Sequence, residues 1–135
     1  MPTGDLVSSV LWLSHLSPAC DLAVVKQIWH TARQRNLNLG LTGTMVFDGE
    51  RFCELLEGPV LDISAVYRDV EFDTRHVDLR VLHMSLGAAP RQLADWRSGY
   101  CDGPALDIFC SPGGLQGEAA MAAFIELLPH CNLSP

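Results

Sequence analysis

The segment RNLNLGLTGTMVFDGERFCELLEGP, residues 35–59, is the part of the sequence that decides the fold. Two runs within it, residues 40–47 and 50–57, alternate apolar and polar side chains on either side of Asp48-Gly49. An Asp-Gly pair tolerates the positive φ angles that a tight hairpin turn needs. The two runs are therefore predicted to be neighbouring antiparallel strands.

The sequence on either side of this hairpin predicts two helices. Ser17-Pro18 is expected to begin the first helix, with the hydroxyl as a cap and the proline in the first turn. Gly58-Pro59 ends the second strand of the hairpin and begins the other helix. The apolar stripe of the first helix is formed by Leu22, Val25, Trp29 and Ala32, and that of the second by Ile63, Val66, Tyr67 and Val70.

Apolar runs at residues 6–13, 79–86 and 96–101 predict three more strands. The resulting order β-α-β-β-α-β-β is typical of an α+β, ferredoxin-like domain with two helices on one face of the sheet. We expect residues 1–103 to form this domain and residues 104–135 to be a helical extension packed on it. A helix at about residues 116–128 has an apolar stripe and is expected on the other face, its members being Met121, Phe124, Ile125 and Leu128.

This extension is expected to cover only part of the second face of the sheet. Side chains such as Leu55 would then stay exposed to solvent. Self-association would bury them, and a two-fold homodimer is the commonest way to do so.

Composition limits the class of protein. Of the 135 residues, 48% are hydrophobic and 19% are charged, as in a soluble globular domain. No apolar run is long enough to span a bilayer and no signal peptide is supported, so we expect no membrane contact and a cytoplasmic location. The net charge of −7 argues against nucleic-acid binding, which needs a basic face. The five cysteines form no CxxC pair and the histidines lack metal-ligand spacing, so reduced thiols and no metal site are expected.

Two polar residues fall at positions that the pattern predicts to be buried. Asn36 extends the stripe of the first helix by one turn, and its amide must bond either to backbone groups at the helix end or to a ligand. Glu54 shares a strand face with Phe52 and Leu56. Its carboxyl is either a proton donor or acceptor toward a ligand, with a raised pKa, or a group near a sheet edge that reaches water.

Other candidate residues have a plain structural interpretation as well. Arg75-His76 offers a cation and an imidazole for an anionic ligand, and equally fits an exposed loop. Trp12, Trp29 and Trp96 are most simply core residues. The sequence holds no phosphate-cradling glycine loop and no serine-nucleophile motif, so an enzyme would have to rely on Glu54 beside His76 alone and is not expected.

With these residues placed, the chain resembles the BLUF family of flavin-binding blue-light sensors. The resemblance covers about residues 6–100 and depends on the order and spacing of five pieces: Asn36 with Leu41-Thr42-Gly43, residues 48–52, residues 55–59, Thr74-Arg75-His76 and Ala94-Asp95-Trp96. It implies that the isoalloxazine ring of FAD lies between the two helices and is hydrogen-bonded by Asn36. It also implies that Arg75 and His76 lie near the flavin and that Trp96 moves near or away from the site.

Three positions depart from the pattern of that family, two of them photochemical. The first-strand tyrosine of the family is Trp12 here, the third-strand glutamine is Glu54, and the methionine two places after the fifth-strand tryptophan is Ser98. Indole has no phenolic proton, and a carboxyl cannot turn from donor to acceptor as an amide does unless it is protonated. We therefore expect the family's photocycle to be altered or lost, with both side chains still lining the flavin site.

The expected function is a BLUF-type sensory domain that binds FAD non-covalently and signals by contact with a protein effector in trans, because no effector domain is attached. The alternative is a flavin-free module for protein contact whose pocket is filled by Trp12, together with Trp29. Filling a pocket with indole rings is favourable without any ligand, because apolar burial contributes about 25 cal/mol per Å².

Overall fold

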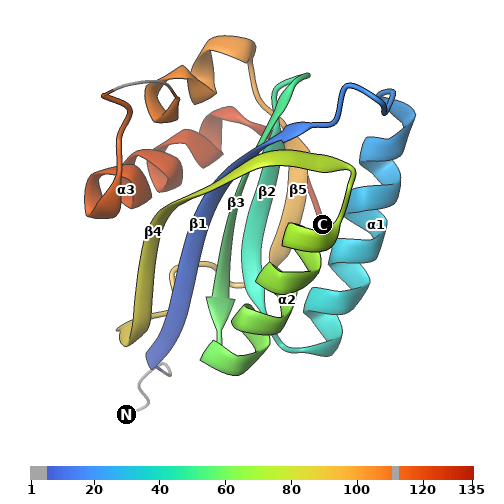
Figure 1. Ribbon diagram of the computed structural model, residues 1–135. Helices are drawn as coiled ribbons and strands as arrows, with labels where there is room; N and C mark the ends of the chain where they lie inside the picture. The colour runs from blue at the N-terminus through green and yellow to red at the C-terminus, as the bar shows by residue number, and fades with distance from the viewer. Residues whose placement is uncertain (1–5, 111–112) are drawn as a thin grey trace.

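A six-stranded sheet of order β4-β1-β3-β2-β5-β6 forms the centre of the molecule in the computed structural model, which describes residues 6–110 and 113–135. The strands are β1 (Leu6–Leu16), β2 (Thr42–Phe47), β3 (Arg51–Gly58), β4 (His76–Pro90), β5 (Trp96–Tyr100) and β6 (Asn132–Ser134). The helices are α1 (Ala23–Asn38), α2 (Val60–Phe72), α3 (Gly117–Leu127) and two short 3₁₀ helices, η1 (Gly103–Phe109) and η2 (Leu128–His130). Helices α1 and α2 lie on one face of the sheet and α3 lies on the other (Figure 1).

The predicted α+β, ferredoxin-like arrangement is confirmed. Strands β2 and β3 are antiparallel and pair from Phe47–Phe52 to Thr42–Glu57. The Asp48 N–H donates to the Arg51 carbonyl at 3.1 Å, so Gly49-Glu50 form the centre of the turn, one residue later than predicted. Strand β5 lies parallel to β2 on its other side. The sequence did not predict β6, a short strand that extends the sheet by antiparallel pairing with β5.

The prediction that Ser17-Pro18 begins the first helix is wrong. These residues lie in a turn, and α1 begins at Ala23, whose backbone N–H donates to Asp21 Oδ1 at 2.9 Å. Leu22 therefore precedes the helix and is 62% exposed, so it is not part of the buried stripe. The buried face of α1 is formed by Val25, Ile28, Ala32 and Asn36.

The sheet separates two apolar cores. Side chains of Trp12, Phe52 and Leu56 face α1 and α2, whereas Leu13, Cys53 and Leu55 face the C-terminal segment. This alternation along β3 is the one that the strand period predicts. The expectation that Leu55 stays exposed is wrong, because α3 and η1 bring Ala120, Phe124, Leu106 and Phe109 onto this face and leave Leu55 fully buried.

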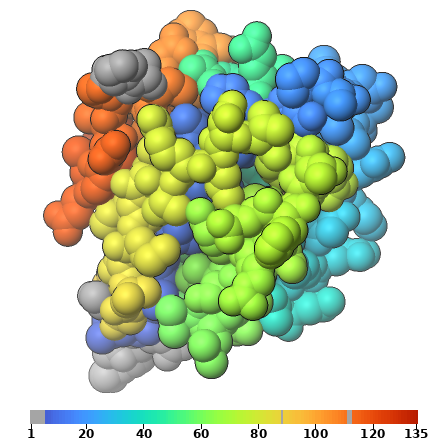
Figure 2. Space-filling model, viewed as in Figure 1, coloured from blue at the N-terminus to red at the C-terminus, as the bar shows by residue number. Residues whose placement is uncertain are grey.

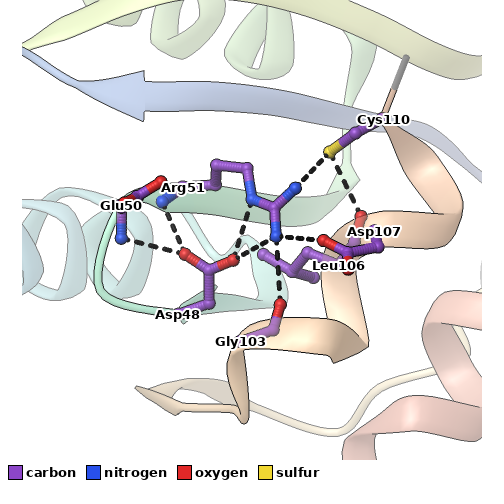
Figure 3. Close-up of polar contacts among 7 residues, drawn as sticks. All are labelled: Asp48, Glu50, Arg51, Gly103, Leu106, Asp107 and Cys110. Atoms are coloured by element: carbon purple, nitrogen blue, oxygen red, sulfur yellow. Dashed lines mark hydrogen bonds and ion pairs between the residues drawn. The ribbon is translucent and has the colours of Figure 1, made fainter. Parts of the chain in front are cut away.

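A polar network fastens the C-terminal segment to the hairpin (Figure 3). The Arg51 guanidinium forms ion pairs with Asp48 at 2.8 Å and with Asp107 at 2.6 Å. It also donates to the Gly103 carbonyl at 3.0 Å and to Cys110 Sγ at 2.9 Å. One side chain thereby joins the turn after β2 to both ends of η1.

Candidate functional site

The candidate site lies between the sheet and the pair of helices α1 and α2. Strand pairing places Trp12 of β1 opposite Glu54 of β3, and Glu54 opposite Met45 of β2, in one row across the sheet. All three side chains point into the core beneath the helices and are at most 1% exposed. The row is central in the sheet, away from both edge strands, so water does not reach it along a strand edge.

Glu54 is a fully buried carboxyl with one of its two oxygens bonded. Trp96 Nε1 donates to Glu54 Oε2 at 3.1 Å, whereas Oε1 has no partner among the described residues. Burial raises the pKa of Glu54 to about 7, against the opposing effects of the Arg35 charge and of the bond from Trp96. The interpretation of Glu54 as a solvated edge residue is therefore wrong, and the group titrates near neutral pH.

Asn36 is the last buried residue of α1. Its backbone carbonyl accepts from Leu41 N–H at 2.9 Å, and its Oδ1 accepts from Arg35 Nε at 3.4 Å. Its Nδ2 is buried and bonds to none of the described residues, so the amide does not satisfy carbonyls at the helix end. A buried amide donor without a partner costs roughly 1–3 kcal/mol, which makes it a point where a ligand acceptor would be stabilising.

Trp12 fills the space below α2. Its indole packs edge-to-face on Tyr67, with ring centroids 5.7 Å apart, and its Nε1 is buried without a partner in the described chain. Trp29 lies toward β5 rather than below α2, and it packs on Tyr100 with ring centroids 5.0 Å apart. Of the two indoles expected in the pocket, only Trp12 is there.

Arg75 and His76 lie at one end of the space between the helices. Arg75 pairs with Asp73 at 2.8 Å and is not a free cation. His76 Nδ1 lies 3.0 Å from Ser14 Oγ, and burial lowers the pKa of His76, so the ring is neutral at pH 7. The sequence prediction missed Arg35, which reaches this end of the space from α1, and Asp73, whose spacing of two from Arg75 was the available signal.

The fit of a flavin ring to this space depends on polar partners and on volume. The unpartnered atoms Asn36 Nδ2, Glu54 Oε1 and Trp12 Nε1 suit a ring that carries carbonyls and ring nitrogens. The cavity beside Arg35, Asp73 and His76 has a volume of only about 20 Å³. That is room for about one water, whereas pockets for such ligands measure ~300 Å³ or more. The ring therefore does not fit this conformation, in which the surfaces of α1 and α2 lie side by side (Figure 2).

The fold and the space between its helices define a ferredoxin-like domain with a closed ligand slot. The chain belongs to the BLUF family, described as sensors of blue-light using FAD, whose family model matches residues 7–99. The structure is similar to "BlsA photo-activated state", with a TM-score of 0.73 and 17% identity over 90% of this chain and 94% of that one. It is also similar to "BlrB - a BLUF protein, dark state structure", with a TM-score of 0.65 and 24% identity over 93% and 87%.

Curated relatives are longer proteins. The blue light- and temperature-regulated antirepressor BluF of Escherichia coli is 27% identical over 74 residues, which are 55% of this chain and 18% of that protein. The photoactivated adenylate cyclase subunit beta of Euglena gracilis is 30% identical over 84 residues, 62% of this chain and 10% of that protein. The chain thus spans less than a fifth of the length of these relatives.

No helix in the described part of the chain is long and apolar enough to cross a membrane. Across residues 6–110 and 113–135, no three His, Cys, Asp or Glu side chains lie together in a way that would hold a metal ion.

Proposed function

We propose that this chain is a BLUF-type signalling domain that acts on another protein by contact, performs no catalysis of its own, and does not run the family's usual photocycle. The observation that carries the proposal is the buried set of Trp12, Glu54 and Trp96. The first two stand where the resemblance places the family's tyrosine and glutamine. Indole has no phenolic proton, and a carboxyl can both donate and accept only in its protonated form. The Glu54 carboxyl accepts a hydrogen bond from the indole of Trp96. We propose this bond as the link between the protonation state of Glu54 and the position of β5.

The two candidate acid–base groups are not accessible to a substrate, which supports signalling rather than catalysis. Glu54, the acid or base that an enzyme would need, is fully buried. His76, the other candidate, is bonded to Ser14 and lies away from the surface. No substrate reaches either group in this conformation, so we propose that the output is a change of surface read by a protein effector in trans.

The finer proposals concern FAD and assembly. Asn36 is the residue we propose as the main ligand of the flavin ring, and Arg75 and His76 line the same space.

A homodimer is proposed through the edge strand β4 rather than through the buried second face, because Met84 is 52% and Leu86 65% exposed there. Size exclusion with light scattering tests this, and a monomer mass at all concentrations would contradict it. The odd number of cysteines, five, without a CxxC pair supports a reducing, cytoplasmic location, and the charge of −7 supports no nucleic-acid partner.

The second candidate is a flavin-free protein-contact module, favoured by the closed slot. For FAD to enter, the Trp12–Tyr67 contact must open, and the apolar packing below α2 would be lost. This packing is stable without a ligand. In this case the family fold is retained only as a surface for the effector.

Addition of FAD to the purified protein, followed by desalting and an absorption spectrum, separates the two candidates. Retained flavin absorption in the natural protein, at least tenfold weaker in Asn36→Ala, supports the flavin site. Asn38→Ala is the matched control, since Asn38 is exposed on the same helix. Absence of flavin from the natural protein with its appearance in Trp12→Ala would establish that the indole closes the slot.

A further inference from the structure

The end of the β5–β6 ladder brings two cysteines together. The antiparallel register pairs Ser98 with Ser134, Gly99 with Leu133 and Tyr100 with Asn132. The next pair in this register is Cys101 and Cys131. Cys131 has extended backbone angles, φ −97° and ψ 157°, so the chain continues in the direction of β6 at this position.

Backbone hydrogen bonds indicate that Cys101 and Cys131 are opposed at a non-hydrogen-bonded position of the ladder. The Cys101 N–H donates to the Phe47 carbonyl of β2 at 3.1 Å, so the polar backbone groups of Cys101 point away from β6. Opposed residues at such a non-hydrogen-bonded position have Cα atoms about 4.5 Å apart. This lies within the range of about 4.4–6.8 Å that disulfides bridge. The two thiols lie close enough for each to influence the pKa of the other.

The other cysteines do not share this arrangement. Cys53 is completely buried in β3, and Cys20 lies in the turn before α1. Cys110 Sγ interacts with the Arg51 guanidinium and with the Leu106 carbonyl. Cys101 and Cys131 are each partly accessible, so a small reagent reaches them in the folded protein.

We propose that Cys101 and Cys131 form a reversible disulfide, by exchange with a low-molecular-weight disulfide such as glutathione disulfide, that fastens the C-terminal segment to β5. Residues 101–131 contain η1, α3 and η2, the elements that cover the second face of the sheet. The strand to which they would be fastened also carries Trp96, the partner of Glu54. The oxidation state of this pair would therefore set the mobility of β5 and of its cover.

The exchange is balanced without any other reactant. The thiolate of one cysteine attacks glutathione disulfide, and an S–S bond to the protein forms as one glutathione thiolate leaves. The second protein thiolate attacks the protein sulfur of this mixed disulfide and displaces the second glutathione. Two protein thiols are oxidised, one glutathione disulfide is reduced, and the two protons pass to the two glutathione thiolates.

Burial controls the rate of this exchange. It raises the pKa of Cys101 to about 12 and also raises the pKa of Cys131. Thiolate is the attacking species, so the exchange is slow at neutral pH and faster in mildly alkaline solution. The pair thus responds to a sustained oxidising poise rather than to a brief pulse of oxidant.

The test uses the folded, natural protein incubated with excess glutathione disulfide in mildly alkaline buffer, then alkylated and digested. We expect one linked peptide that contains Cys101 and Cys131, its loss after dithiothreitol, and a melting temperature raised by roughly 10 °C in the oxidised form. Cys20→Ser should behave like the natural protein, whereas Cys101→Ser and Cys131→Ser should give neither the linked peptide nor the shift.

Two results would overturn the proposal. One is the recovery of both cysteines as free or merely glutathionylated thiols after prolonged oxidation of the natural protein. The other is a linked peptide that joins either of them to a different cysteine. Both measurements are made on the natural protein, so they do not depend on the folding of a variant.

Discussion

Replacement of Glu54 by glutamine is expected to change how stability depends on pH. The pKa of this carboxyl is raised from its ordinary value of 4.5 to about 7 in the folded protein, mainly by burial. Between these values the folded state holds a proton that the unfolded state has released, so stability falls as pH rises through this window. The full loss above about pH 7 corresponds to about 3 kcal/mol.

Glutamine does not titrate and keeps an oxygen that can accept from Trp96. The free energy of unfolding of Glu54→Gln, measured relative to the natural protein, should therefore rise by about 3 kcal/mol between about pH 4.5 and pH 8. Urea denaturation at several pH values measures this difference, and the titration of other groups cancels in the comparison.

Glu118→Gln is the matched control, because Glu118 is exposed on α3 and should give no such trend. A difference between Glu54→Gln and the natural protein that stays constant across this pH range would refute the reasoning, since Glu54 would then ionise alike in the folded and unfolded chain.

Three further predictions follow from the site and its supports. Illumination of the protein reconstituted with FAD should not give the family's reversible red shift of the absorption band, and Trp12→Tyr with Glu54→Gln should recover it; a red shift in the natural protein would contradict this. Arg51→Ala should destabilise the protein by about 1–3 kcal/mol in urea denaturation because it releases η1 from the hairpin, whereas Arg97→Ala, which breaks an exposed ion pair, should stay within about 0.5 kcal/mol. Leu55→Ala should cost about 2–5 kcal/mol by the same measurement, and a value below 1 kcal/mol would show that α3 does not cover the second face.

The sequence alone determined the elements that depend on local chemistry. Asp48-Gly49 predicted the hairpin, because its turn needs the positive φ that Gly49 adopts, and Pro59 marks the start of α2 because it lacks an N–H. The period of two along β3 also assigned Glu54 to the helix-facing side and Leu55 to the opposite one. Membership of the BLUF family was inferred from the order of these sequence pieces, and the match of the family model to residues 7–99 confirms it.

Only the tertiary structure decided how deeply those side chains are buried and which residues they contact. The alternation of side chains assigns Glu54 to a face of the sheet but does not give its distance from water. That distance depends on the central place of β3 in the sheet and on Trp96 of β5, which bonds to the carboxyl. The closed slot depends on the contact of Trp12 with Tyr67, two residues far apart in the sequence. The pairing of Cys101 with Cys131 likewise needs β6, a strand of three residues that is too short to leave a periodic signal and forms only because β5 offers it an edge.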